Sequence, residues 1–293
     1  MVLGGAALGL GSWIVWAGPE GAVNQSSALD GPSGAANRLD RGHLIEWGEF
    51  RTLSLAFSPD SKRVFSLEGV IFKDVKAAVR NVASQGKAFV FTTHPTNAGS
   101  VICPALKLLA TPSGESSINL IDLSTNRLVR TLKPQLTSGP LCFSPGGNLL
   151  AIGSTRGLML YNVRLGKLLR TVPHDDYVDQ LQFSPDGGKL FVTFMDSKPR
   201  VIRVADGRRL RLPAWFSSMG RTDAFALSPD GATAATSWWE MVALWSTRSG
   251  KRRRKLRSGL VKVESIAFSP DGKTLALGGQ SRGEPTIEFQ SVQ

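Results

Sequence analysis

The chain has 293 residues, of which 42% are hydrophobic and 20% are charged, so it can bury a substantial core in one large domain or two small ones. It has only two cysteines and three histidines, which excludes a disulfide framework and a metal site with the usual His or Cys spacing. The formal net charge is +12, and residues 200–262 carry fourteen Lys or Arg against four Asp or Glu. This predicts a basic surface, either an attractor of anionic partners or a solvated face.

The first segment, residues 2–18, contains no charged side chain. Its length lies at the lower limit for a membrane span and also suits the core of a signal peptide. We therefore expect a membrane anchor or export signal over residues 1–18. Residues 19–41 are rich in Gly, Ser, Ala and Asn, which predicts a flexible linker. No basic residue precedes the segment, which a truncated start explains, and a disordered leader is the alternative. The interpretation favours an anchored or exported protein over a cytoplasmic one.

A short string of the form Phe/Leu-Ser-Pro-Asp/Gly then recurs along the chain. It begins at Phe57, Phe143, Phe183, Leu227 and Phe268. The first interval is twice the others, and residues 103–111 align with residues 144–152 as a degenerate copy at the missing position. The six prolines are then spaced by 45, 41, 40, 44 and 41 residues, at Pro59, Pro104, Pro145, Pro185, Pro229 and Pro270. Such regular self-similarity predicts a repeat protein.

Each repeat predicts four short strands. An apolar strand ends at the Ser-Pro turn, where Pro presets φ and Gly supplies a positive φ. A second strand follows, such as residues 189–194, and a loop leads to a third, such as residues 158–163. A Gly-Lys turn then leads to a fourth strand, such as residues 167–172. Four strands in every 40–45 residues are typical of the blades of a β-propeller.

We therefore predict an all-β fold over residues 42–293, a β-propeller of six four-stranded blades. The last repeat ends after its third strand, residues 286–291, and residues 42–47 resemble a fourth strand. Pairing of these two strands closes the ring in the prediction and removes two exposed sheet edges. A seven-bladed or incomplete propeller is the alternative.

The repeats resemble the WD repeats of the WD-repeat β-propeller family, most clearly over residues 157–172 and 242–256. The resemblance implies the propeller fold, and it implies a non-catalytic binding platform for a protein or peptide. The copies are degenerate, because none keeps both residues at the Trp-Asp position: the pairs there are Ile121-Asp122, Tyr161-Asn162 and Trp245-Ser246. Only His174, with Asp176 two residues later, resembles the His and Asp that stiffen many WD blades.

The sequence contains no nucleophile elbow, phosphate-binding loop or dinucleotide fingerprint. Asp179, Asp223 and Glu264 fall at equivalent positions at the start of inner strands, so they could surround the mouth of the central channel. No histidine accompanies them, and we expect neither an enzyme nor a cofactor or metal site. A propeller enzyme or a cation site at this mouth is the remaining alternative.

Aromatic residues gather in the loops that the family topology places on one face. We predict that a protein or peptide binds there, because Trp and Tyr dominate interface hot spots. The alternative is that some of them fold over blade edges as additional core. The candidate partner-binding residues are Asp175, Asp176, Tyr177, Trp215, Phe216, Trp238 and Trp239.

A basic patch is the second candidate surface, and anionic lipid or nucleic acid is the partner it implies. Its residues are Arg208, Arg209, Arg211, Lys251, Arg252, Arg253, Arg254, Lys255 and Arg257. The alternative is that charged outer strands only prevent edge-to-edge pairing between molecules. We favour a monomeric scaffold that binds protein through the aromatic loops, with the anionic-surface binder as the alternative function.

Overall fold

The computed structural model describes residues 50–292, apart from gaps at residues 71–74, 84–86, 94–98, 114–115, 126, 135–138, 155–156, 196, 218–221 and 283. The leader over residues 1–18, the linker over residues 19–41 and the predicted closing strand over residues 42–47 lie outside the described residues. Within the described part of the chain, no helix has the length and hydropathy needed to cross a membrane.

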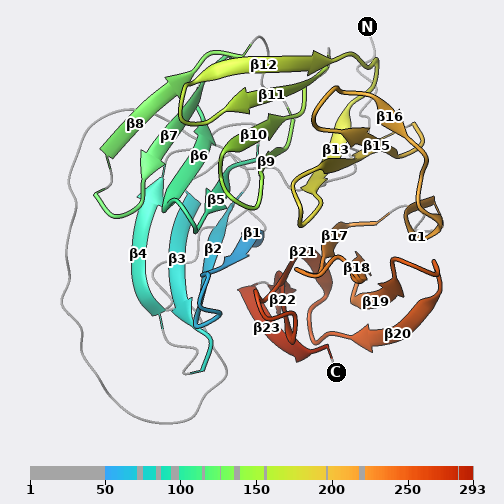
Figure 1. The fold of residues 1–293 in the computed structure, drawn as a ribbon. Coiled ribbons are helices and arrows are strands. Elements are labelled where there is room, and N and C mark those ends of the chain that lie inside the picture. Colours follow the sequence, from blue (N-terminus) through green and yellow to red (C-terminus); the bar gives the residue numbers. More distant parts are fainter. Residues whose placement is uncertain are drawn as a thin grey trace, which may run out of the picture.

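Six antiparallel sheets follow one another in chain order around a central axis, and we call each sheet a blade (Figure 1). Blade one contains β1 (Phe50–Phe57), β2 (Arg63–Val70), β3 (Val75–Asn81) and β4 (Lys87–Thr93). Blade two contains β5 (Val101–Cys103), β6 (Leu108–Pro112), β7 (Ile118–Asp122) and β8 (Arg127–Leu132). Blade three contains β9 (Leu141–Phe143), β10 (Leu149–Ile152), β11 (Leu158–Asn162) and β12 (Lys167–Val172).

Blade four contains β13 (Val178–Phe183), β14 (Lys189–Phe194), β15 (Arg200–Arg203) and β16 (Arg209–Leu210), and a short helix, α1 (Ala214–Ser217), follows it. Blade five contains β17 (Ala224–Leu227), β18 (Thr233–Trp238), β19 (Met241–Ser246) and β20 (Arg252–Arg257). Blade six contains β21 (Lys262–Phe268), β22 (Thr274–Ser281) and β23 (Glu284–Ser291). The first strand of each blade contacts the first strands of its two neighbours, so the predicted β-propeller is confirmed.

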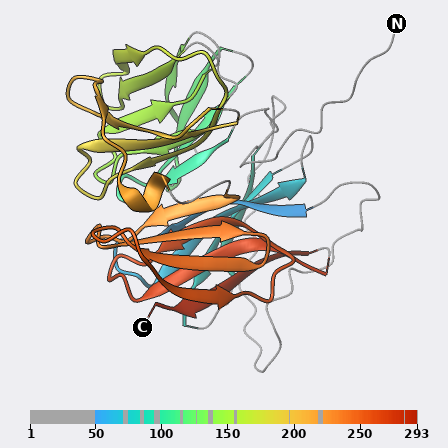
Figure 2. The same cartoon turned by 90° about the vertical axis from the view of Figure 1, so that its right-hand side faces the viewer.

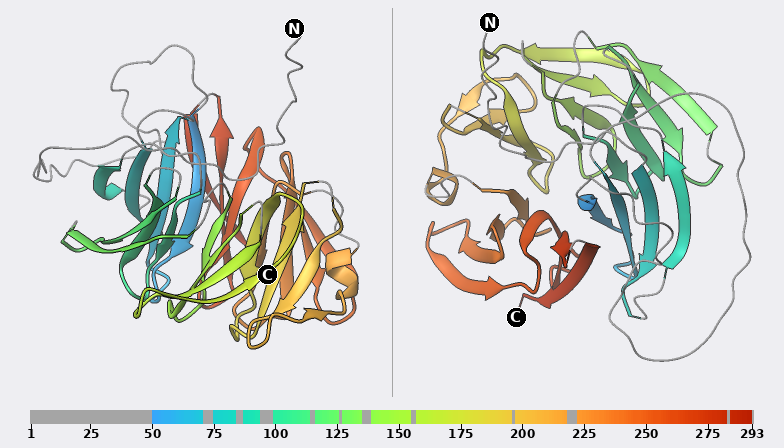
Figure 3. Two further views of the ribbon diagram at one scale, coloured as in Figure 1. Left: turned by 90° about the horizontal axis from the view of Figure 1, so that it is seen from above. Right: turned by 180° about the vertical axis from the view of Figure 1, so that it is seen from behind.

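The prediction of six four-stranded blades is wrong, because five blades have four strands and the sixth sheet has three among the described residues. The strand assigned to complete that sheet, residues 42–47, lies outside the described residues. Within the described residues the ring closes by packing, since β1 contacts all three strands of blade six (Figure 3, right). The rings of Phe57 and Phe289 meet edge to face at 6.3 Å, and Phe57 shares a buried cluster with Ile287. The described residues form an incomplete propeller.

The Ser-Pro turns hold the first two strands of each blade together through side-chain chemistry. In blade four, the hydroxyl of Ser184 donates to Asp186 Oδ1 and accepts from the backbone N–H of Lys189 at 2.9 Å. The same three-residue arrangement recurs at the turns that begin with Ser58, Ser228 and Ser269. Each turn thereby satisfies buried polar atoms locally, which is why the string is so regular in the sequence.

The degenerate repeat found by spacing at Pro104 is confirmed as blade two. Cys103 replaces the serine of the other turns and is buried. Lys107, with a φ of +53°, supplies the positive φ that the turns of blades three to six take from glycine and that blade one takes from Ser61. Cys142, on β9 of the next blade, is also buried, and both thiols are free. Burial raises the pKa of Cys142 to about 11.

Candidate interaction surfaces

Two adjacent tryptophans form the tip of the hairpin between β18 and β19. Trp238 pairs with Met241 as the last pair of the ladder, so Trp239 and Glu240 make a two-residue connection. Trp238 is 64% exposed and Trp239 is 55% exposed. Trp239 has a φ of +54°, a left-handed conformation that is rare for a bulky residue. We call Trp238 and Trp239 the tryptophan tip.

The tryptophan tip is tied to the neighbouring blade by a specific network. The backbone N–H of Trp239 donates to Asp223 Oδ2 at 2.8 Å, and the carbonyl of Trp239 accepts from the N–H of Val263 in blade six at 2.8 Å. The other Asp223 oxygen, Oδ1, lies 2.8 Å from Lys262 Nζ, and both side chains are mostly buried. These bonds fix the backbone that carries the two exposed rings, and such over-determination is what allows a strained conformation to persist.

A second exposed ring, Tyr177, lies in the loop between β12 and β13 and is 51% exposed. Asp176 positions this loop, because its carboxylate accepts from the backbone N–H groups of Tyr177 and Ser197, each at 2.7 Å. Asp175 is exposed. Asp176 therefore has a structural role here, while Tyr177 and Asp175 remain accessible to a partner.

The structure corrects the prediction that Trp215 and Phe216 belong to the binding surface. Both lie on α1 and are buried, at 1% and 0% exposure, so they take the core alternative rather than a place on the binding surface. The Phe216 ring packs against Phe191 and Phe225, with centroids 5.1 and 5.6 Å apart. Figure 2 shows α1 between blades four and five. The outer strand β16 has only two residues, and Leu210 and Leu212 beside it pack against the cluster that contains Trp215 and Phe216.

The basic patch divides into two parts on the outer rim. Five of the six residues of β20 are exposed cations, the exception being Leu256, and Arg208, Arg209 and Arg211 are exposed around β16. Figure 1 shows α1 between β16 and β20, so the two parts do not form one continuous stripe. Arg208 also lies 3.6 Å from Asp206, and Arg257 lies 3.9 Å from Glu240.

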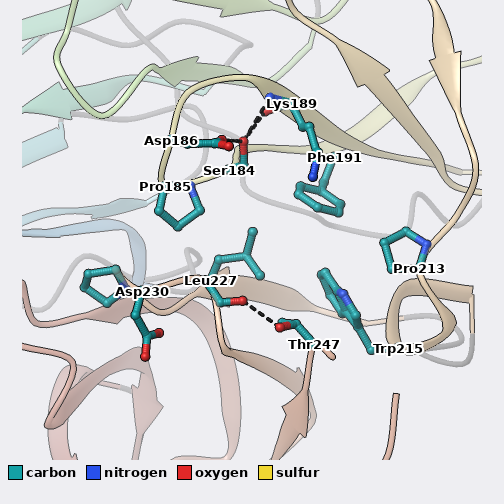
Figure 4. Close-up of a pocket in the computed structure, with 12 residues that line it drawn as sticks. Ser184, Pro185, Asp186, Lys189, Phe191, Pro213, Trp215, Leu227, Asp230 and Thr247 are labelled. Atoms are coloured by element: carbon teal, nitrogen blue, oxygen red, sulfur yellow. Dashed lines mark hydrogen bonds between the residues drawn. The ribbon is translucent and has the colours of Figure 1, made fainter. Parts of the chain in front are cut away.

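A groove with a volume of about 510 Å³ opens between blades four and five (Figure 4). The Ser-Pro turns of both blades form its rim, and Phe191, Trp215 and Leu227 contribute its apolar lining. It lies at the end of β18 opposite to the tryptophan tip, because β18 begins beside the turn of Pro229 and ends at Trp238. Sequence reasoning missed this groove, since it identified these prolines only as turn residues.

Two of the three acidic residues proposed to surround the channel mouth, Asp179 and Asp223, make structural contacts. Asp223 holds Lys262 and the tryptophan tip, as described above. Asp179 Oδ2 accepts from Thr193 at 3.4 Å. Among the described residues, no three His, Cys, Asp or Glu side chains lie close enough together to share a metal ion.

His174 is buried beside Phe194, with ring centroids 5.2 Å apart. Burial lowers its pKa from the usual value. Neither ring nitrogen has a hydrogen-bond partner among the described residues, so the His–Asp arrangement of a regular WD repeat is not formed here. The His174 ring packs against Phe194 instead. This apolar environment favours the neutral imidazole, because a buried charge would not be solvated.

No protein-family model matches the chain. Over 138 residues, 46% of the chain, it is 30% identical to an uncharacterized WD repeat-containing protein of Synechocystis sp., and the match spans 39% of that relative. A chain in a crystal structure of the mitotic checkpoint complex superimposes with a TM-score of 0.57 at 18% identity, covering 86% of this chain and 79% of that one. The β-propeller domain of Cps50 (Swd1) from Myceliophteria thermophila gives a TM-score of 0.57 at 15% identity, covering 85% and 98%. At these identities the structures establish the fold. The resemblance to WD-repeat β-propellers is therefore confirmed: the chain is a β-propeller built from degenerate WD-like repeats.

Proposed function

We propose that the protein is a non-catalytic binding platform that holds a protein or peptide partner at the tryptophan tip. The observation that carries the proposal is the exposure of two adjacent tryptophans on a backbone fixed by Asp223 and Val263. Exposing two indole rings to water is unfavourable, and the turn itself does not need them. Large rings on a rigid support also lose little conformational entropy on binding, which is why Trp is enriched at interface hot spots.

Tyr177 and Asp175 extend the proposed binding surface. Both are exposed on the loop before β13, which by propeller topology belongs to the same face as the connection between β18 and β19. A carboxylate beside an exposed ring favours a segment that carries both an apolar and a basic side chain. In this account the exposed cations of β20 serve only to prevent this edge strand from pairing with other molecules.

The proposal is tested by selecting peptides from a phage-displayed random library with the immobilised protein. The wild type is compared with Trp238→Ala/Trp239→Ala and with Leu128→Ala/Val129→Ala, a control that removes exposed apolar side chains elsewhere. We expect the wild type and the control to enrich the same sequences and the tryptophan variant to lose them. Enrichment that survives in the folded tryptophan variant, or that is absent from the wild type, contradicts the proposal.

A further inference from the structure

The outer strands of blades two, three and five share one irregularity at the same position. In each, the pairing with the third strand skips one residue: Val129 in β8, Leu169 in β12 and Arg253 in β20. Such a bulge leaves its extra residue unpaired and turns neighbouring side chains outward. The fold therefore presents two adjacent side chains to solvent at the middle of each of these edges.

Blades two and three fill this position with aliphatic residues. Leu128 and Val129 are 57% and 55% exposed, and Leu168 and Leu169 are 48% and 54% exposed. Leu165, in the turn before β12, is 59% exposed. We call these five residues the apolar edge. In blade five the equivalent pair is Arg252 and Arg253, both exposed, so the fold itself does not require apolar side chains here.

The outer strand of blade two contacts blade three beside the apolar edge. Arg130 of β8 donates to the carbonyl of Arg164, in the turn that precedes β12, at 3.2 Å. The Arg130 side chain also lies so close to Gly166 that a Cβ there would meet it at 2.7 Å. Figure 1 shows β8 and β12 along one side of the ring and β20 on the other.

The two segments that carry the apolar edge are basic, although Asp122 pairs with Arg127 at the start of β8. Residues 123–133 and 163–173 contain six Lys or Arg and no Asp or Glu. Arg130 and Arg170 bind backbone carbonyls of the next blade. The other four cations are exposed and form no ion pair within the described part of the chain; they are Arg127, Lys133, Arg164 and Lys167.

We propose that the apolar edge lies on the surface of an anionic lipid bilayer, with the leucines and Val129 in the boundary between headgroups and acyl chains. Exposed aliphatic side chains interleaved with Lys and Arg are the combination that interfacial membrane binding uses. A protein partner is less well matched, because protein interfaces favour aromatic residues. The two segments contain no aromatic residue. The inference does not depend on the tryptophan tip, which lies on another blade.

Site-specific labelling tests whether this edge enters the bilayer. Cys103 and Cys142 are buried, so a single added cysteine can be labelled with the environment-sensitive dye NBD. Leu169→Cys places the dye on the apolar edge, and Arg253→Cys places it at the equivalent bulge of blade five. With phosphatidylcholine vesicles that contain phosphatidylserine, we expect a blue shift and a brighter signal at position 169 only. No change at position 169, or the same change at both positions, overturns the proposal.

Vesicle sedimentation separates apolar insertion from charge attraction. Leu168→Ser/Leu169→Ser keeps the net charge, and we expect it to weaken binding to the same vesicles by about tenfold or more, because two aliphatic side chains no longer leave water. The matched variant Arg252→Ser/Arg253→Ser removes two charges from the opposite rim, and we expect a smaller loss. Binding that depends on the arginine pair and is insensitive to the leucine pair contradicts the proposal. Thermal melts of both variants verify that these exposed changes leave the fold intact.

Discussion

The carboxylate of Asp223 joins two blades, because one oxygen lies 2.8 Å from Lys262 Nζ and the other accepts a 2.8 Å hydrogen bond from the backbone of Trp239. Asp223 precedes β17 in blade five, whereas Lys262 begins β21 in blade six. The same residue thus couples the packing of two blades to the position of the tryptophan tip.

Removing this carboxylate is expected to destabilise the protein. Asp223→Ala leaves Lys262, whose side chain is only 26% exposed, without its partner, and the expected loss is about 1–3 kcal/mol of unfolding free energy. Urea denaturation measures it. The control is Asp206→Ala, which breaks exposed contacts with Arg203 and Arg208 and should cost less than about 1 kcal/mol. Equal losses in the two variants argue against a coupling role for Asp223.

Replacing Trp239 by glycine tests whether the protein needs this tryptophan for folding. Glycine adopts the φ of +54° without strain, so Trp239→Gly should leave the unfolding free energy unchanged or raise it by up to about 1 kcal/mol. Trp238→Gly, at the last residue of β18, should instead lower it by about 0.5–1 kcal/mol. Denaturant melts compare the two variants. A clear loss of stability in Trp239→Gly alone indicates that the tryptophan is retained for folding.

Replacing Trp215 tests the assignment of α1 to the core. Trp215→Ala is expected to cost about 3–5 kcal/mol, because it leaves a cavity beside Phe191 and Phe216. Trp238→Ala, at an exposed position, should change the unfolding free energy far less. Equilibrium unfolding of the two variants gives the comparison, and a small effect of Trp215→Ala contradicts the buried assignment.

The Ser-Pro turns predict a loss of stability in acid. In four of these turns the pKa of the aspartate lies below its usual 3.8. The main cause is the hydrogen bond that the carboxylate accepts from the serine hydroxyl, and the second is a hydrogen bond from a backbone N–H. The four residues are Asp60, Asp186, Asp230 and Asp271. A lowered folded-state pKa gives stability that is present above the unfolded pKa, and this contribution is lost as the pH falls through the folded value. The thermal midpoint should therefore drop below about pH 4. Replacing all four by Asn, which keeps an acceptor oxygen but cannot be protonated, should reduce this drop. An unchanged acid dependence contradicts the assignment.

The parts of this structure that depend on local chemistry could be predicted from the sequence. The turn at Ser184 is closed by residues within five positions of it, so its string repeats visibly, and even the degenerate copy at Pro104 followed from spacing. The burial of Trp215 could not be predicted in this way, because it depends on how short β16 is. The groove between blades four and five needed the positions of two turns that lie 44 residues apart in sequence. The contact between Asp223 and Trp239 likewise joins a loop to a hairpin.

The most direct test of the binding account is calorimetric titration of the most strongly selected peptide into the wild type and into Trp238→Ala/Trp239→Ala. The account predicts saturable binding to the wild type and an affinity at least about tenfold weaker in the variant. An equal dissociation constant for the two folded proteins would show that the partner binds elsewhere on the propeller.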